Sequence, residues 1–447
     1  MGWGLGTVLA VLTLGVATPA HGQDSVAVTL EAARTAAREH APMVGVARAR
    51  ARAAREGVTA AGGFRLPSVG VEAGAMRSND PVAAFGTRLR QGRITAADFD
   101  PTLLNDPAAL TDWSGAVGAR WAPVDFSRDA ALAAARSAAE AARLGAEWTV
   151  RASEFQAEVR YVEAVGMARE LEAARAALEA AAANERVIGR RAEEGFLTDA
   201  DVLQARASVE AARAGEIDAR RRLADARARL GVVLGWPLDR TPIPVDTLIP
   251  FTVHADEGSI EERLDLRASH AGVELARARV REAGGSRLPT VEGFARFETH
   301  SPEVFSGMKS DWTVGFTVKV PVFTGFQVES HRRAAQAQHT AMELEHERTL
   351  REARVELEEA RRALDAATQG ARAAEAAAAA AEEALRLMQR RFEEGLTTTA
   401  ELLGAESRAS ALRVNAVRAD LNRGLAAARL NFLTDFDHDD LSGGMDS

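Results

Sequence analysis

The sequence predicts a mostly α-helical fold with a small β part, arranged as two copies of one unit. Three observations indicate this fold. Ala, Glu, Arg and Leu dominate long stretches, with 27% charged and only 5% aromatic residues, which is typical of long helices. Proline, which breaks helices, is absent between Pro123 and Pro237 and after Pro321. One motif also occurs twice, in the same sequence context.

The repeated motif reads RRAEEGFLTDADVLQAR at 190–206 and RRFEEGLTTTAELLGAE at 390–406, so that its glycines lie 200 residues apart. A second pair, AGGFRLPSV at 61–69 and AGGSRLPTV at 283–291, follows the same order. Because solenoid repeats have periods of about 20–50 residues, this spacing indicates a duplicated half. We expect a first structural repeat over 23–257 and a second over 258–434.

The two ends of the chain have distinct compositions. Residues 1–22 are typical of a secretory signal peptide, with an apolar core from Val8 to Val16 and small residues near Ala20. The alternative, an N-terminal membrane anchor, is disfavoured because a spanning helix needs about 18 apolar residues. Residues 435–447 form a predicted acidic tail. Its DFDHDD run lacks the glycine and the final Glu of an EF-hand loop.

Each repeat contains a predicted long helical hairpin, at 126–234 and at 327–433. In the first, a helix from Phe126 to about Arg191 breaks near a glycine, and a shorter helix returns from about residue 200. The second hairpin repeats this pattern, because glycine permits the turn and Thr and Asp side chains start helices. A shorter helix opens each repeat, at 28–62 and 259–283.

Four segments of about ten residues alternate between apolar and polar side chains: 66–76, 113–122, 288–298 and 311–320. This period of two is typical of outer-membrane β-strands, and aromatic residues near the strand ends are typical of a membrane interface. The predicted interface aromatics are Trp113, Trp121, Trp312 and Phe316. The alternative is an amphipathic hairpin on a soluble core, for which the chain has little other β-rich sequence.

Four transmembrane strands cannot close a barrel by themselves. Bacterial single-chain barrels have at least about eight strands, and open sheet edges are not tolerated in lipid. The chain must therefore pool its strands with copies of itself, in a number that this argument leaves open. The connections at 77–111 and 299–310 are expected to be loops that face away from the helices.

This order of elements, occurring twice, resembles the TolC-like outer membrane efflux protein family. The resemblance rests on the RLP strand starts at 65–67 and 287–289, the W…P strand ends at 113–123 and 312–321, and the two EEG motifs. It implies a homotrimer in the outer membrane of a Gram-negative-type bacterium. The four strands of each protomer would contribute to a shared twelve-stranded β-barrel, and the helices would form a periplasmic tunnel.

The resemblance also implies a function and partners. The protein would be a passive exit duct of a tripartite efflux or type I secretion system, surrounded by outer-membrane lipid. It would dock a periplasmic adaptor (membrane fusion) protein and an inner-membrane transporter of RND, ABC or MFS type. The exported substrate and the pump class stay open. The alternative function is a secreted or periplasmic coiled-coil scaffold without a pore.

The family's site residues correspond to positions in the repeated motif. The adaptor-docking hairpin tips would be Gly195, Phe196, Leu197, Thr198, Gly395, Leu396, Thr397 and Thr398. The periplasmic gate candidates are Asp201, Glu401 and Phe392, because a ring of carboxylates from symmetric copies can select cations or hold a gate.

The chain departs from the family pattern at three gate positions. Gly404 stands where a second acid would lie, and Phe392 and Thr397 replace a tyrosine and an arginine that tie the gate helices together. A structural reading of Glu401 is also open, because a glutamate in a first helical turn interacts favourably with the helix dipole.

No motif indicates an enzyme or a cofactor. The chain has no phosphate-binding G-x-x-x-x-G-K-[ST], no H-E-x-x-H and no nucleophile elbow. A net charge of −9 provides no basic surface for nucleic acid. His331, His339 and His346 share a helical face, but about 11 Å separates neighbours along the axis, so one metal ion cannot bridge them. We therefore expect no catalytic residues, no metal site and no nucleic-acid partner.

Overall fold

The computed structural model describes residues 24–237, 239–247, 260–304 and 306–434. The signal peptide predicted at 1–22, the boundary between the repeats at 257/258 and the acidic tail at 435–447 lie outside the described residues. The chain divides into two compact units, and each takes segments from both sequence repeats. The first unit comprises Met1–Pro42, Arg151–His254 and Ala360–Phe432, and the second comprises Met43–Val150, Ala255–Glu359 and Leu433–Ser447.

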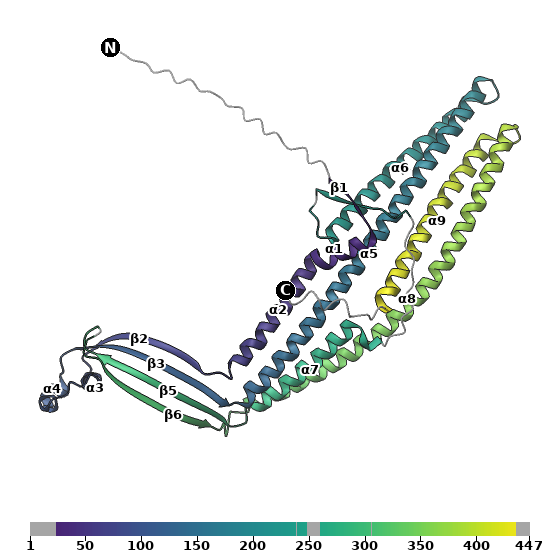
Figure 1. Cartoon of the computed structure of the whole chain (residues 1–447). Helices are drawn as coiled ribbons and strands as arrows, with labels where there is room; N and C mark the ends of the chain where they lie inside the picture. Colours follow the sequence, from purple (N-terminus) through teal and green to yellow (C-terminus); the bar gives the residue numbers. More distant parts are fainter. Residues whose placement is uncertain (1–23, 238, 248–259, 305, 435–447) are drawn as a thin grey trace, which may run out of the picture. The chain divides into compact units, whose positions relative to one another are not determined.

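The mostly helical fold class is confirmed, and four long helices contain most of the helical residues. They form two hairpins: α5 (Phe126–Glu193) with α6 (Asp199–Val233), and α8 (Gln327–Glu393) with α9 (Thr399–Thr434). Figure 1 shows the two hairpins in blue-green and yellow-green. The C-terminal parts of α5 and α8 belong to the first unit and their N-terminal parts to the second.

Small residues and buried charges hold the helices of the first unit together. Gly166 on α5 lies so close to α9 that an added Cβ would meet the Leu421 side chain at 2.9 Å. One helical turn further, the buried Glu170 accepts a hydrogen bond from Arg418 of α9 at 2.9 Å and forms an ion pair with Arg222 of α6 at 3.3 Å. Both oxygens of this carboxylate therefore have partners, as a buried charge requires.

The first unit also contains a small parallel sheet that the sequence analysis missed. Strand β1 (Asp24–Val28) pairs with β4 (Arg240–Pro244). The hydroxyl of Tyr161, a fully buried residue of α5, donates to an Asp246 carboxylate oxygen at 2.6 Å and lies 3.2 Å from the Val28 carbonyl oxygen. This tyrosine, the only one in the sequence, therefore ties the sheet to the long helix.

The single opening helix expected over 28–62 is wrong. Residues 24–28 are β1, and the rest divides into α1 (Leu30–His40) and α2 (Pro42–Gly63). Ala41 has extended backbone with φ −59° and ψ 129°, because a proline disfavours helical geometry in the residue before it and has no N–H to donate. The break therefore falls immediately before Pro42.

The second unit contains a four-stranded antiparallel sheet in the order β2-β3-β5-β6 (Figure 1). Its strands are β2 (Ser68–Ser78), β3 (Leu110–Val124), β5 (Thr290–Ser301) and β6 (Lys309–Lys319). Each lies within a few residues of a segment with alternating polarity. The register of β3 with β5 shifts between Trp121 and Val124, which lengthens β3 beyond its expected end.

Helix α7 (Leu264–Gly285), preceded by the short η2 (Ile260–Glu262), also belongs to the second unit. The buried Arg263 anchors its start, with ion pairs to Asp265 at 2.7 Å and to Glu356 of α8 at 3.3 Å. At its other end, Gly285 lies against the backbone of Ser127, where a Cβ would come within 2.8 Å. Only glycine permits this approach without a backbone shift.

The expectation that residues 77–111 form a loop is wrong for much of the segment. The segment contains α3 (Pro81–Arg90), η1 (Ala96–Phe99) and α4 (Pro101–Asn105). Asp80 and Asp100 cap α3 and α4, and a proline follows each of them. Asp followed by Pro is also a turn signal, but here each proline occupies the first position of a helix, which its fixed φ suits.

Candidate functional site: sheet faces and hairpin ends

One face of the four-stranded sheet is apolar across its whole width. The register aligns Val71, Val117, Phe297 and Trp312 in a single row. In one protomer this face is bare, since Val71 is 78% exposed and Trp312 is 73% exposed. A contiguous exposed apolar surface of this kind marks an interface with lipid or protein.

The predicted interface aromatics all lie on this apolar face. Trp121 aligns with Phe316 through Gly293, and Trp113 lies eight residues before Trp121 on the same strand face. All four aromatic side chains are exposed in the single chain. The Trp121 indole N–H donates to the Arg65 carbonyl oxygen at 2.9 Å. The polar edge of the indole is therefore satisfied by the backbone, while the rest of the ring stays exposed.

The opposite face of the sheet is polar and carries paired charges. The guanidinium of Arg296 on β5 donates to Glu298 at 2.7 Å and to Glu72 on β2 at 3.0 Å. Small residues, Gly70 and Gly118, occupy the row of Arg296 on the two neighbouring strands. The sheet therefore separates an apolar surface from a charged one, as the strands of a water-filled barrel do.

The sheet is open at both sides. Among the described residues, β2 pairs only with β3 and β6 pairs only with β5. The outer edges of β2 and β6 are free to pair with other strands, which unpaired N–H and C=O groups favour.

The two hairpin ends in the first unit share one backbone conformation. Gly195 has φ +84° and Gly395 has φ +76°, in the left-handed region that favours glycine. The amide of Gly195 donates to the Ala192 carbonyl oxygen at 2.9 Å, and that of Gly395 donates to the Phe392 carbonyl oxygen at 3.0 Å. The predicted tips at 195–198 and 395–398 therefore form equivalent turns.

The acidic gate candidates cap the helices that follow these turns. A carboxylate oxygen of Asp201 accepts from the Thr198 amide at 2.9 Å, and one of Glu401 accepts from the Thr398 amide at 2.9 Å. Hydrogen bonds from the Thr397 hydroxyl and from Thr398 lower the pKa of Glu401 to about 2. The Thr198 hydroxyl and amide lower the pKa of Asp201 in the same way. Both side chains are therefore charged at neutral pH.

The apolar residues of the tips divide into exposed and buried ones. Phe196 and Leu396, next to the two glycines, are 72% and 62% exposed. Leu197 is half-buried against a cluster of residues from both hairpins, defined here as the tip cluster. Its buried members are Ile188, Ala205, Phe392, Leu402 and Leu403.

Phe392, the third gate candidate, is the largest side chain of the tip cluster and is 2% exposed. The guanidinium of Arg191, at the end of α5, lies over its ring at 5.1 Å from the centroid. Phe392 therefore joins the two hairpins within one protomer.

A buried polar contact that the sequence analysis missed also joins the hairpins. The Asn184 side-chain amide on α5 donates to a carboxylate oxygen of Glu406 on α9 at 2.7 Å. Glu406 is 5% exposed, and burial raises its pKa above the ordinary value. The available signal was a difference between the repeats, because Arg206 occupies the equivalent position in the first copy.

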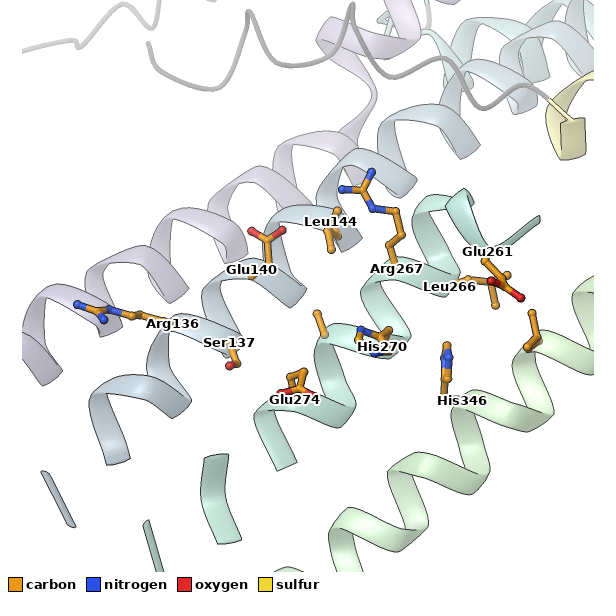
Figure 2. Close-up of a pocket in the computed structure, with 12 residues that line it drawn as sticks. Arg136, Ser137, Glu140, Leu144, Glu261, Leu266, Arg267, His270, Glu274 and His346 are labelled. Carbon is orange, nitrogen blue, oxygen red and sulfur yellow. The ribbon is translucent and has the colours of Figure 1, made fainter. Parts of the chain in front are cut away.

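A pocket of about 730 Å³ lies between α5, α7 and α8 in the second unit (Figure 2). His270 of α7 and His346 of α8 approach each other at its wall, with ring centroids 5.6 Å apart. Arginine and glutamate side chains both line the pocket. Within the described residues, no group of three His, Cys, Asp or Glu side chains is placed to hold a metal ion.

No helix in the described ranges is both long and apolar enough to cross a membrane.

Solved structures of other proteins share this fold, among them the following three. One is a membrane protein from Pseudomonas aeruginosa, with a TM-score of 0.78, 20% identity and coverage of 91% of this chain and 93% of the other. The second is the CmeC outer membrane channel of Campylobacter jejuni, with a TM-score of 0.79, 15% identity and coverage of 91% and 85%. The third is VceC of Vibrio cholerae, with a TM-score of 0.76, 20% identity and coverage of 91% and 96%.

The sequence itself also matches a relative and a family model. It is 29% identical over 318 residues to Protein CyaE of Bordetella pertussis (strain Tohama I), which covers 67% of this chain. The match spans 61% of that relative, less than two thirds of its length. The model of the family described as Outer membrane efflux protein matches residues 33–236 and 258–434, which is most of the chain. With its helical hairpins and its two-faced sheet, this chain belongs to the outer membrane efflux protein family.

Proposed function

We propose that this outer membrane efflux protein is a passive homotrimeric exit duct of a tripartite efflux or type I secretion system. The observation that carries the proposal is the open sheet of four strands with one continuous apolar face. A single chain leaves this face and both sheet edges uncovered. In a closed barrel, lipid would cover the face and neighbouring strands would cover the edges.

The number of subunits comes from the family, and the strand count is consistent with it. Four strands per chain are too few for a barrel, and three chains would supply twelve, above the minimum of about eight. In such a trimer, the charged face with Arg296 would line the pore. Trp113, Trp121, Trp312 and Phe316 would lie against outer-membrane lipid near its interfaces.

We assign the hairpin tips to docking of a periplasmic adaptor protein. Phe196 and Leu396 are large apolar side chains exposed at the turns, and the backbone of both tips is held by glycine and threonine caps. Apolar residues on a rigid support are suited to anchoring a partner helix. The adaptor would connect the duct to an inner-membrane transporter of RND, ABC or MFS type, which would supply the energy.

The gate assignment stays part of this proposal. In a trimer, Asp201 and Glu401 would bring charged carboxylates to the periplasmic end, where they can select cations. Phe392 would act by holding the hairpins together. We also assign the repeats at 23–257 and 258–434 to duplication of one unit, preceded by a signal peptide at 1–22.

A reconstitution experiment tests the duct. Protein purified from outer membranes should conduct ions in planar lipid bilayers and should leave the membrane only with detergent. Val314→Arg, on the apolar face, should abolish membrane insertion because an arginine at the lipid face costs about 2–4 kcal/mol near the midplane. Thr317→Arg, on the polar face of the same strand and opposite Glu292, is the matched control. A soluble protein without conductance would instead support the periplasmic scaffold.

A second experiment tests docking. Replacing Phe196 and Leu396 by Glu should abolish export in cells while conductance of the purified protein stays unchanged. Ile217→Glu changes an exposed apolar residue of α6 outside the tip and should leave export intact. Normal export by the double tip variant would refute the docking assignment without affecting the channel.

A further inference from the structure

We propose that Arg391 closes the ring of hairpin ends by hydrogen bonding to the backbone of a second copy of this chain. Its guanidinium would donate to the carbonyl oxygens of Ala192 of the partner subunit and Glu193 of the partner subunit. The inference rests on the proposed trimer. It assigns the contact that joins neighbouring protomers at the hairpin ends.

The template for this contact lies within one protomer. Arg191, in the last turn of α5, reaches across to the last turn of α8. It donates to the carbonyl oxygen of Phe392 and, at 3.4 Å, to that of Glu393. Carbonyls in the last turn of a helix lack partners within that helix and carry its negative dipole end. Arg191 therefore caps a helix of the other hairpin.

The duplication places the same donor and acceptors at the opposite ends. A shift of 200 residues converts Arg191 into Arg391, Phe392 into Ala192 and Glu393 into Glu193. The turns that follow are equivalent, since Phe196 and Leu396 each donate their amide to the arginine carbonyl five residues earlier, at 2.8 Å in both cases. The end of α5 therefore presents the acceptor pair that Arg191 uses on α8.

In a single chain this second set of groups does not meet. Arg391 is exposed, and the one hydrogen bond found for its side chain in the described residues goes to the Leu396 carbonyl oxygen at 3.5 Å. Its charge also acts on Glu401. For Glu193, the described residues contain no hydrogen bond to its carbonyl oxygen that matches the one at Glu393. Donor and acceptor are therefore both available to a neighbour.

A cyclic oligomer brings the two sets together. In a closed ring every junction between protomers joins two different surfaces, so the second hairpin of one copy lies beside the first hairpin of the next. If first and second hairpins alternate around the ring with the same orientation, Arg391 contacts the C-terminal end of the partner's α5. This contact is equivalent to the one that Arg191 makes with the C-terminal end of α8. Each donor then has an acceptor.

The two kinds of junction differ in strength. Within a protomer, the arginine also stacks on the ring of Phe392, and Asn184 bonds to Glu406. At the junction between protomers, the positions equivalent to these three side chains hold other residues. Ala192 corresponds to Phe392, Ala384 to Asn184 and Arg206 to Glu406. Only the helix cap is retained there. The junctions between protomers are therefore the weaker ones, where the periplasmic end separates first.

Proximity can be tested by thiol cross-linking, because the chain contains no cysteine. The double variant Arg391→Cys with Glu193→Cys, treated in membranes with a short bis-maleimide, should yield covalent dimers and trimers on denaturing gels. A bis-maleimide is preferable to a disulfide, which needs Cα atoms within about 7 Å. The matched pair Arg191→Cys with Glu393→Cys should form only internal links, and each single variant should give no multimers.

The outcomes separate the inference from the proposed function. Internal links in the control pair without multimers in the test pair would overturn the contact of Arg391 while leaving the duct intact. If neither pair forms multimers and the wild-type protein is a monomer that does not conduct, the proposed function itself fails.

Conductance tests what the contact does. Arg391→Gln should raise conductance in bilayers by about tenfold or more, the effect of losing a hydrogen bond made by a charged donor. Arg391→Lys keeps the charge but not the paired donors, and should be intermediate. Arg390→Gln, at the adjacent exposed position, is the matched control. Wild-type conductance of Arg391→Gln would overturn the proposal.

Discussion

The two hairpin ends have the same backbone but different side chains at the positions that are buried. The turns at Gly195 and Gly395, with the capping residues that follow, make equivalent hydrogen bonds of similar length. The large ring of the tip cluster, however, comes from the second end alone, because Phe392 occupies the position that Ala192 has in the first copy. The two ends thus share the turn, while their contributions to the contacts between the hairpins differ.

This difference shows what each feature is needed for. A turn has to satisfy its own backbone, so glycine and a capping threonine suffice in both copies. Two hairpins with equivalent ends, in contrast, need one interface within a protomer and, in the proposed trimer, another between protomers. Side chains that strengthen only one of them, such as Phe392 and Glu406, make the protomer asymmetric. The predictions below probe this asymmetry.

The largest effect is expected for Phe392→Ala. Removing a fully buried aromatic ring from a packed cluster costs about 3–5 kcal/mol, and it also leaves Arg191 without the ring beneath it. Thermal unfolding of the detergent-solubilised protein, followed by circular dichroism, measures the loss. Phe196→Ala, at the other end, removes a ring that is 72% exposed and should shift the unfolding temperature little. Equal shifts for the two variants would refute the asymmetry.

A smaller and more symmetric effect is expected for the glycines. Gly195→Ala and Gly395→Ala each force a side chain into the left-handed region, which costs about 1–2 kcal/mol. At Gly195 an added Cβ meets nothing within 4 Å, and at Gly395 it meets only the end of Arg191, at 3.9 Å. Strain alone therefore decides both, and the two unfolding temperatures should fall equally. A clear difference between the variants would show that the two turns are not equivalent.

Much of this fold was accessible from the sequence because its signals are local and repeated. The proline-free intervals predicted both hairpins, and the alternation around Trp312 and Trp121 predicted strands whose register then aligns the apolar residues. A half-buried strand and a long helix each have a period that the residues themselves carry.

The missed features depend on contacts between distant segments. Strand β1 has five residues and exists through its pairing with β4 and the Tyr161 hydroxyl, so its own sequence carries little signal. The helix cap by Arg191 and the Asn184–Glu406 contact join residues more than 200 positions apart. The gate candidates Asp201 and Glu401 were identified by position, whereas their capping hydrogen bonds needed the turn geometry.

Glu406 should make the contact between the hairpins sensitive to pH. Because burial raises its pKa above 4.5, the folded protein holds this proton more tightly than the unfolded chain does. The stabilisation is fully present below pH 4.5 and is lost as the pH rises through the raised pKa. Glu406→Gln stays neutral, so at pH 7 its free energy of unfolding should exceed that of the wild type by about 1 kcal/mol, and its unfolding temperature should be higher. At low pH the two proteins should have the same stability. Identical pH profiles of the two proteins would contradict this. Arg206→Gln, the equivalent position in the first copy, should leave the pH profile unchanged.

The smallest effect is expected at the helix caps, and there the two ends should differ in detail. Thr198→Ala and Thr398→Ala each remove a capping side chain, at a cost of roughly 0.5–1 kcal/mol at an exposed end. Glu401 accepts from Thr397 as well as from Thr398, whereas the position equivalent to Thr397 is Leu197. The second cap therefore retains one hydroxyl donor after Thr398→Ala. Hydrogen exchange of the first-turn amides should consequently accelerate more in Thr198→Ala.

Acid should weaken the caps in a defined range. The pKa of Glu401 is lowered to about 2 from 4.5, so its contribution is present above pH 4.5 and is lost as the pH falls from 4.5 toward 2. Glu401→Gln should remove this dependence on acid from the amide exchange of the second turn. If Glu401 instead acts only at the gate, Glu401→Gln would change cation selectivity and leave the exchange rates as they are in the wild type. A change in both readouts would show that the same carboxylate holds the turn and lines the duct. Thr397→Ala removes one hydrogen bond to Glu401 and should separate the two roles, because it frees the side chain but keeps its charge.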